Sequence, residues 1–137
     1  MTRSTISVAT IVAVALGGAL GAVLRWACGE LAADGDGFPW TTFAVNVSGC
    51  LAIGLLPAAR AVARRPVLTA AVGPGLLGGF TTMSAYAEQT RALLAGGHTP
   101  TALAYLTGTL VACVGAVALA DRLTGDHAVD AVEVVEP

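Results

Sequence analysis

Four long apolar runs, separated by short polar intervals, make up almost all of this 137-residue chain. Segments 6–24, 37–59 and 66–87 contain no charged residue, and only His98 interrupts the fourth run, 92–120. Each run reaches or approaches the ~20 residues that cross ~30 Å of hydrocarbon as a helix. We therefore predict an all-α membrane protein with four transmembrane helices. The predicted spans are about 5–27, 39–59, 66–94 and 100–120.

The composition supports a single membrane domain. Hydrophobic residues make up 55% of the chain and charged residues 12%, against roughly 25% charged in a soluble domain. We assign 1–124 to the transmembrane domain and 125–137, which alternates acidic and small apolar residues without helical period, to a solvated tail. The run after Arg3 is longer than the apolar core of a signal peptide, so we expect it to be a retained first helix.

The distribution of arginine predicts the orientation in the membrane. The N-terminal end, the loop between spans two and three and the C-terminal end together hold five of the seven basic residues, and the opposite side holds two. By the positive-inside rule, we expect a multi-pass protein of the cell membrane with both termini in the cytoplasm. The first group is Arg3, Arg60, Arg64, Arg65 and Arg122; the second is Arg25 and Arg91.

A polar, glycine-containing stretch interrupts the third span. It runs Gly-Gly-Phe-Thr-Thr-Met-Ser over residues 78–84. Glycine costs about 1 kcal/mol against alanine in a helix, and a freed backbone group in hydrocarbon costs several kcal/mol unless something satisfies it. Because broken helices are tolerated only where they face protein, a cavity or an ion, we expect a broken third helix and look for function there.

The side chains inside the spans limit the mechanism. No Asp, Glu, Lys or His lies deep in a span, so a proton-coupling carboxylate is missing, as is a pairing of nucleophile and base. Hydroxyls, an amide and aromatic rings suit the passive passage of a small anion, and we do not expect an enzyme. These polar positions are Asn46, Ser48, Thr81, Thr82, Ser84, Tyr86 and, on one face of span four, Tyr105, Thr109 and Cys113.

Small residues are expected to serve packing. Gly17, Gly18 and Gly21 on span one, with Gly49 and Gly54 on span two, would let helices approach closely. Four short helices do not easily enclose a pore, so we expect an oligomer. The cysteines Cys28, Cys50 and Cys113 lie in or next to separate spans without metal-ligand spacing, and are expected to act as small hydrophobic residues rather than as ligands or disulfides.

Three motifs, in order, resemble the CrcB/Fluc fluoride-channel family. Residues 17–26, GGALGAVLRW, are similar to its G-G-x-x-G-x-x-x-R-[YW] opening, and residues 39–49, PWTTFAVNVSG, to its P-x-G-T-L-x-V-N-x-x-G segment, with Thr41 in place of glycine. Residues 78–86, GGFTTMSAY, are similar to G-G-x-T-T-F-S-T-F.

The resemblance implies an antiparallel, dual-topology dimer with two fluoride pores, which lowers cytoplasmic fluoride by passive export. It also implies a central structural sodium ion on the backbone carbonyls of Gly78 and Thr81. Arg25 would lie at the aqueous mouth or anchor the turn in span three. The implied fluoride pathway comprises Asn46, Met83, Ser84, Tyr86, Tyr105 and Thr109.

One departure from the family pattern bears on the identity of the second subunit. The family places two phenylalanines where this chain has Met83 and Tyr86. The electropositive edge of an aromatic ring can face an anion, and methionine offers no such edge. Together with the arginine bias, this favours a heterodimer with an inverted homologous subunit over a homodimer. The alternatives are a small multidrug antiporter, whose membrane carboxylate is missing here, and a pore-inactive structural subunit of a heterodimeric channel.

Overall fold

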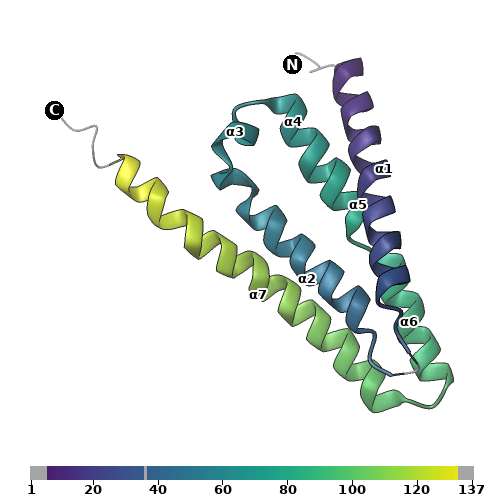
Figure 1. Cartoon of the computed structure of the whole chain (residues 1–137). Coiled ribbons are helices and arrows are strands. Elements are labelled where there is room, and N and C mark those ends of the chain that lie inside the picture. Colours follow the sequence, from purple (N-terminus) through teal and green to yellow (C-terminus); the bar gives the residue numbers. More distant parts are fainter. Residues whose placement is uncertain (1–5, 36, 133–137) are drawn as a thin grey trace, which may run out of the picture.

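The computed structural model describes residues 6–35 and 37–132, with side chains up to residue 125. All elements in these ranges are helical, and the chain folds back and forth as an elongated bundle (Figure 1). The elements are α1 (Val8–Leu31), α2 (Trp40–Leu55), the 3-10 turn η1 (Leu56–Ala58), α3 (Arg60–Ala63), α4 (Pro66–Ala70), the π-helical η2 (Ala71–Leu77), α5 (Gly78–Phe80), α6 (Met83–Ala95) and α7 (Thr99–Val132).

Four helical segments are long and apolar enough to cross a membrane, which confirms the predicted all-α class with four candidate spans. These segments are Val8–Leu31, Trp40–Ala58, Pro66–Ala95 and Thr99–Gly125.

The ends of the first and last helices differ from the sequence-based expectation. The hydroxyl of Ser7 accepts a hydrogen bond from Thr10 N (3.2 Å) and caps α1, which continues to Leu31 rather than ending near residue 27. Helix α7 continues to Val132, so the backbone stays helical over most of the segment predicted as a tail without helical period. Extending an existing helix adds a hydrogen bond for each residue fixed, which offsets weak local propensity. Residues 1–5 and 133–137 of these predictions lie outside the described residues, and the domain limit at 124 stays a prediction.

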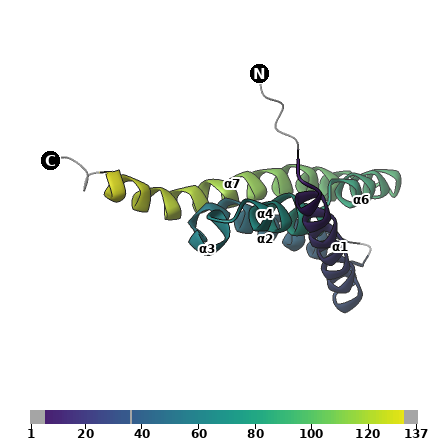
Figure 2. The same cartoon turned by 90° about the horizontal axis from the view of Figure 1, so that it is seen from above.

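The helices pack in two closely contacting pairs. Helix α1 packs along the third span, and α2 packs along α7, with α6 closing onto the first part of α7 (Figures 1 and 2). Glycines make the first pair possible: a Cβ at Gly17 or Gly21 would overlap a backbone carbonyl of the third span, of Ala71 or Leu76 respectively. A Cβ at Gly54 would in turn meet the side chain of Ala120 on α7. The predicted use of glycine as contact surface is confirmed.

The third span changes conformation twice. Pro74 lies within the π-helical turn η2, where a missing N–H is tolerated because the hydrogen-bond ladder is already irregular. Helix α5 ends at Phe80, and the backbone then becomes extended at Thr81 (φ −74°, ψ 157°) and Thr82 (φ −147°, ψ 122°). Helix α6 starts afresh at Met83, capped by the hydroxyl of Thr82, which accepts from Ala85 N (3.1 Å). This two-residue interruption positions the site described below.

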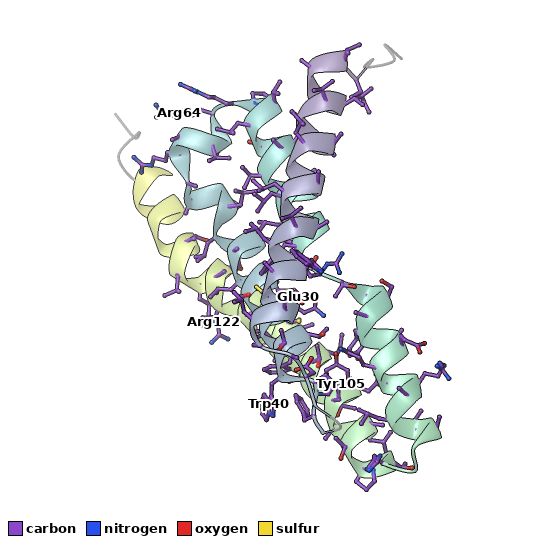
Figure 3. The ribbon with its side chains drawn as sticks, turned by 45° about the vertical axis from the view of Figure 1, so that its right-hand side comes forward. Glu30, Trp40, Arg64, Tyr105 and Arg122 are labelled. Carbon is purple, nitrogen blue, oxygen red and sulfur yellow. The ribbon has the colours of Figure 1, made fainter. Side chains whose placement is uncertain are left out.

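Arg64 and Tyr105 lie towards opposite ends of the bundle (Figure 3). Arg64 lies at one end, near the start of α1, whereas Glu30, Trp40 and Tyr105 lie towards the other end (Figure 3). Many large apolar side chains on the outer faces are exposed in the single chain, among them Leu16, Leu110 and Val111. Such faces suit lipid or a second subunit rather than water.

Candidate functional site

The amide of Asn46 holds both backbone groups of Thr82 at the interruption of the third span. Its Oδ1 accepts from Thr82 N (2.8 Å), and its Nδ2 donates to the Thr82 carbonyl (3.0 Å). Asn46 is buried on α2, so these bonds are formed away from solvent. The side chain therefore replaces the hydrogen bonds that the extended backbone loses, as a polar group inside a membrane protein must.

The same rearrangement frees backbone carbonyls. In an unbroken helix, Thr82 N would bind the carbonyl of Gly78, and Ala85 N would bind that of Thr81. Here Asn46 takes the first N–H and the hydroxyl of Thr82 takes the second. The carbonyl oxygens of Gly78 and Thr81 are thus left without the N–H donors that a continuous helix would give them. The next carbonyl, of Gly79, accepts instead from Nε of Arg25 on α1 (3.3 Å).

A cavity of about 250 Å³ opens beside the interruption. It lies between α2, the third span and α7, and its wall combines polar groups with sulfur-containing and apolar ones. The lining residues are Asn46, Cys50, Thr81, Thr82, Met83, Tyr86, Thr109, Leu110 and Cys113. The structure thus brings Asn46, Met83, Tyr86 and Thr109 of the predicted pathway to one place.

The hydroxyl groups near this cavity differ in their availability. The hydroxyl of Tyr86 donates to the carbonyl of Leu106 (2.5 Å), and the fully buried Tyr105 donates to Oε1 of Gln89 (2.8 Å). By contrast, Oγ1 of Thr109 is the one buried side-chain oxygen or nitrogen without a partner among the residues whose side chains are described. Thr109 is therefore the hydroxyl in this wall that has no hydrogen-bond partner within the chain's described side chains and backbone.

Two predicted pathway residues lie outside the lining of this cavity. The hydroxyl of Ser84 is exposed and lies 3.3 Å from that of Thr82. Tyr105 instead forms the centre of an aromatic cluster, in edge-on contact with Phe38 (centroids 5.3 Å apart) and Tyr86 (5.2 Å). The Tyr86 ring faces both the cavity and this cluster.

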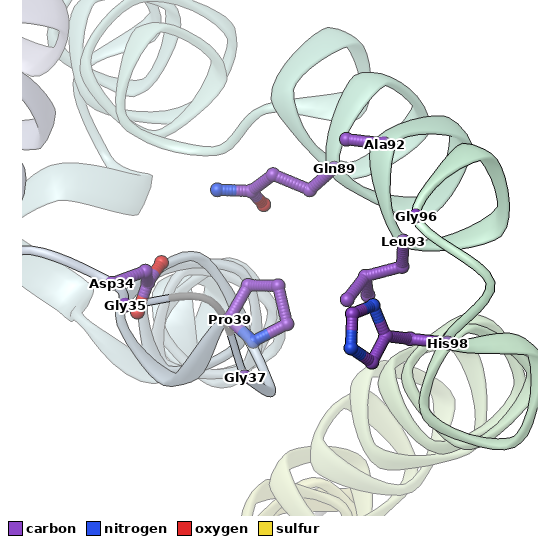
Figure 4. Close-up of a pocket in the computed structure, with 9 residues that line it drawn as sticks. All are labelled: Asp34, Gly35, Gly37, Pro39, Gln89, Ala92, Leu93, Gly96 and His98. Carbon is purple, nitrogen blue, oxygen red and sulfur yellow. The ribbon is translucent and has the colours of Figure 1, made fainter.

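Two further cavities lie closer to the α6–α7 end of the bundle. One of about 390 Å³ shares Thr82 with the first and is also lined by Arg25, Glu30 and Thr42. The next, of about 560 Å³, shares Asp34 and Gln89 with it. Figure 4 shows Gln89 and His98 extending into this last cavity, opposite Asp34 and Pro39.

Comparison with known proteins agrees with these features. Residues 12–120 match the family model described as CrcB-like protein, Camphor Resistance (CrcB). This chain belongs to the CrcB family. Its relatives include the fluoride-specific ion channel FluC 1 of Streptomyces coelicolor, 46% identical over 119 residues (80% of this chain, 73% of the relative). They also include FluC 2 of Nocardia farcinica, 44% identical over 114 residues (81% of each chain), and FluC of Thermus thermophilus, 44% identical over 117 residues (82% of this chain, 92% of the relative).

Membership of the CrcB family confirms the resemblance drawn from the three motifs, and it gives no support to the multidrug antiporter alternative. Four residues of the cavity lining were not among the predicted pathway residues or sodium ligands: Cys50, Thr82, Leu110 and Cys113. Cys50 lies one helical turn after Asn46, a spacing that places both on one face of α2. Thr82 lies within the third motif, but its roles as helix cap and as partner of Asn46 depend on the fold.

Proposed function

We propose that this chain is a subunit of a fluoride-specific channel. The observation that carries the proposal is the unpaired, buried hydroxyl of Thr109 in the wall of a cavity beside the interrupted third span. Fluoride is small and accepts hydrogen bonds, so a hydroxyl donor in a water-poor cavity can replace part of its hydration shell. A neutral donor also binds the anion less tightly than a cationic side chain would, and so permits its release.

The pathway that we propose follows the three cavities. Fluoride would move between the aqueous α6–α7 end and the interruption by way of Gln89, Thr82 and Thr109, with the Asn46 amide beside it. In this proposal, the extended backbone at Thr81 and Thr82 is the point at which the third span borders the fluoride pathway. Ser84 and Tyr105 would support the pathway from its edge.

Transport along this pathway would be passive. An inside-negative membrane potential drives an anion outward, by about 2.3 kcal/mol per charge for each 100 mV. Such a leak would lower cytoplasmic fluoride that enters as the neutral weak acid and ionises inside.

The test is fluoride efflux from liposomes that contain the purified complex, with potassium and valinomycin setting the potential and chloride as control ion. Thr109→Val should reduce efflux severely, because it removes the donor and keeps the shape. Thr107→Val is the matched control, since the exposed Thr107 hydroxyl already donates to the Leu103 carbonyl (2.7 Å). Equal efflux from both variants and the unsubstituted protein would contradict the assignment of Thr109.

The freed carbonyls of Gly78 and Thr81 fit a structural sodium ion. A hard cation prefers oxygen ligands, and backbone carbonyls of a broken helix supply them without charge. In the proposed dimer, each subunit would contribute these two carbonyls, with Arg25 orienting the neighbouring carbonyl of Gly79. The bound ion would supply positive charge that holds the two breaks together. Thermal unfolding of the complex should occur at higher temperature in sodium than in N-methylglucamine; identical transitions would contradict the assignment.

A second, inverted subunit would complete the site, and we favour a heterodimer with a homologous partner. Three observations support this: exposed apolar faces, the excess of arginine at one end, and Met83, which is 76% exposed in the single chain. Light scattering and efflux measured on the chain alone test it. Stable, conducting homodimers would contradict the heterodimer.

The excess of arginine also supports cytoplasmic termini in the cell membrane. C-terminal fusions to alkaline phosphatase and to a fluorescent protein test this orientation. Activity of the phosphatase fusion would show a C-terminus outside the cytoplasm and contradict it.

Met83 favours one further candidate, a pore-inactive structural subunit of a heterodimeric channel. Without an aromatic edge at this position, the pore bordered by this chain would conduct poorly while its packing faces still held the partner. The efflux experiment separates a conducting subunit from a structural one. If this chain is only structural, Thr109→Val should leave the fluoride efflux of the assembled complex unchanged.

A further inference from the structure

Three sulfur-containing residues from three different helical segments line the cavity beside the interruption. They are Cys50 on α2, Met83 at the start of α6 and Cys113 on α7. Both cysteines are free and only partly buried, and both line this one cavity, from helices that pack against each other. Met83 also lines the cavity and is largely exposed in the single chain.

This set of ligand atoms has a defined chemical preference. Thiolate and thioether sulfur are soft ligands, which favour soft metal ions such as Cu(I) over hard ions such as sodium or magnesium. Soft monovalent ions accept two or three sulfur ligands, so two thiols and one thioether suffice. Among the described residues, no group of three or more His, Cys, Asp and Glu side chains could hold a metal ion, and the three sulfurs are a different kind of ligand set because one of them is a thioether.

We propose that this cavity binds a soft, thiophilic monovalent cation, Cu(I) or Ag(I), through the thiolates of Cys50 and Cys113, with the thioether of Met83 as third ligand. The two thiols lose their protons on binding, so one cation and two thiols give two metal–sulfur bonds and two released protons. The complex carries one net negative charge. The free hydroxyl of Thr109, in the same wall, can donate a hydrogen bond to it.

The position of the site gives it a consequence for transport. A metal in a cavity of about 250 Å³ occupies the space beside Asn46 and Thr109. Its negative charge in a medium of low polarity also repels an anion. If the chain conducts as proposed, the bound metal closes that pathway. Metal binding itself does not require conduction, so the two proposals can fail separately.

The chain offers a matched control. Cys28, the third cysteine, lines a different cavity together with Leu31, Trp40 and Phe80. A Cys28→Ser variant therefore removes one thiol of three without touching the proposed ligands. Loss of binding in Cys50→Ser and Cys113→Ser, but not in Cys28→Ser, would be specific to the cavity.

The experiment titrates Cu(I) into the full chain, purified in detergent with reduced thiols, against a chromophoric Cu(I) chelator. We expect one Cu(I) per chain, lost in Cys50→Ser and in Cys113→Ser, weakened in Met83→Leu and unchanged in Cys28→Ser. X-ray absorption should show sulfur ligands only, with fewer of them in Met83→Leu. Thermal unfolding identifies any serine variant that fails to fold, and Cys50→Ala or Cys113→Ala then replaces it.

Two outcomes would overturn the proposal. Binding that persists in folded variants without Cys50 or Cys113 would place the metal elsewhere, and so would nitrogen ligands in the absorption spectrum. An equal loss of binding in Cys28→Ser would show that the thiols act without regard to position.

Discussion

Asn46 and Thr82 are joined by a two-way hydrogen-bond pair: the amide oxygen accepts from the Thr82 N–H at 2.8 Å, and the amide nitrogen donates to the Thr82 carbonyl at 3.0 Å. An amide side chain presents an acceptor and a donor side by side, whereas an ionised carboxylate presents acceptors alone. The pair stabilises an extended backbone inside an apolar span and leaves the carbonyl of Gly78 without its helical donor. One residue of α2 thus shapes the site in the third span.

Replacing Asn46 by alanine should destabilise the protein. The Thr82 N–H would lose its partner in a buried setting, which costs about 1–3 kcal/mol. Asn46→Asp should also be destabilising, because a carboxylate would face the Thr82 carbonyl without a proton to donate. Thermal unfolding in detergent measures both effects.

Ser48→Ala is the control for this substitution. The Ser48 hydroxyl is on the same helix, but it is exposed and donates to the carbonyl of Val45 (3.2 Å). We expect nearly unchanged unfolding. An Asn46→Ala protein as stable as Ser48→Ala would show that the Thr82 backbone finds another partner.

Tyr86→Phe should separate stability from transport. The Tyr86 hydroxyl is engaged with the carbonyl of Leu106 rather than free in the cavity. Its removal should cost about 1 kcal/mol of stability, while fluoride efflux stays the same or rises because the ring edge remains. A loss of efflux as large as that of Thr109→Val would mean that the hydroxyl itself serves the anion.

Met83→Phe should increase fluoride efflux through the assembled complex. Phenylalanine restores an electropositive ring edge at a position that borders the cavity. Met83→Leu is the matched control, since it is apolar, similar in volume and lacks a ring. Efflux that rises equally in both variants would indicate a steric effect of methionine and not a missing aromatic edge.

The sequence predicted the four candidate spans because crossing a membrane demands long uncharged runs, a property of each segment by itself. It also predicted a break within residues 78–84, since glycine and threonine lower helix propensity locally. The hydrogen-bonding partners of polar side chains could not be predicted from the sequence in the same way. That Tyr105 binds Gln89 and Tyr86 binds Leu106 depends on how α6 and α7 pack, and spacing along one helix does not report it.

The cysteines illustrate the same limit. Cys50 and Cys113 are far apart in sequence, so no ligand spacing links them, and packing of α2 against α7 brings both to one cavity. In the sequence, Met83 is notable only because it occupies a position where the family has a phenylalanine. Beside two thiols it becomes a sulfur ligand, a role that depends on its neighbours and not on its own segment.

Gly21→Ala and Gly29→Ala make the same change on helix α1 and should shift stability in opposite directions. A Cβ at Gly21 would overlap the carbonyl oxygen of Leu76, a backbone atom of the third span that has little room to move, whereas a Cβ at Gly29 meets nothing within 4 Å. Overpacking at Gly21 should cost about 1–3 kcal/mol, and alanine at Gly29 should stabilise the helix by roughly 0.5–1 kcal/mol. Thermal unfolding of the two variants measures the difference. Equal destabilisation would contradict the close contact between α1 and the third span, because only that contact distinguishes the two sites.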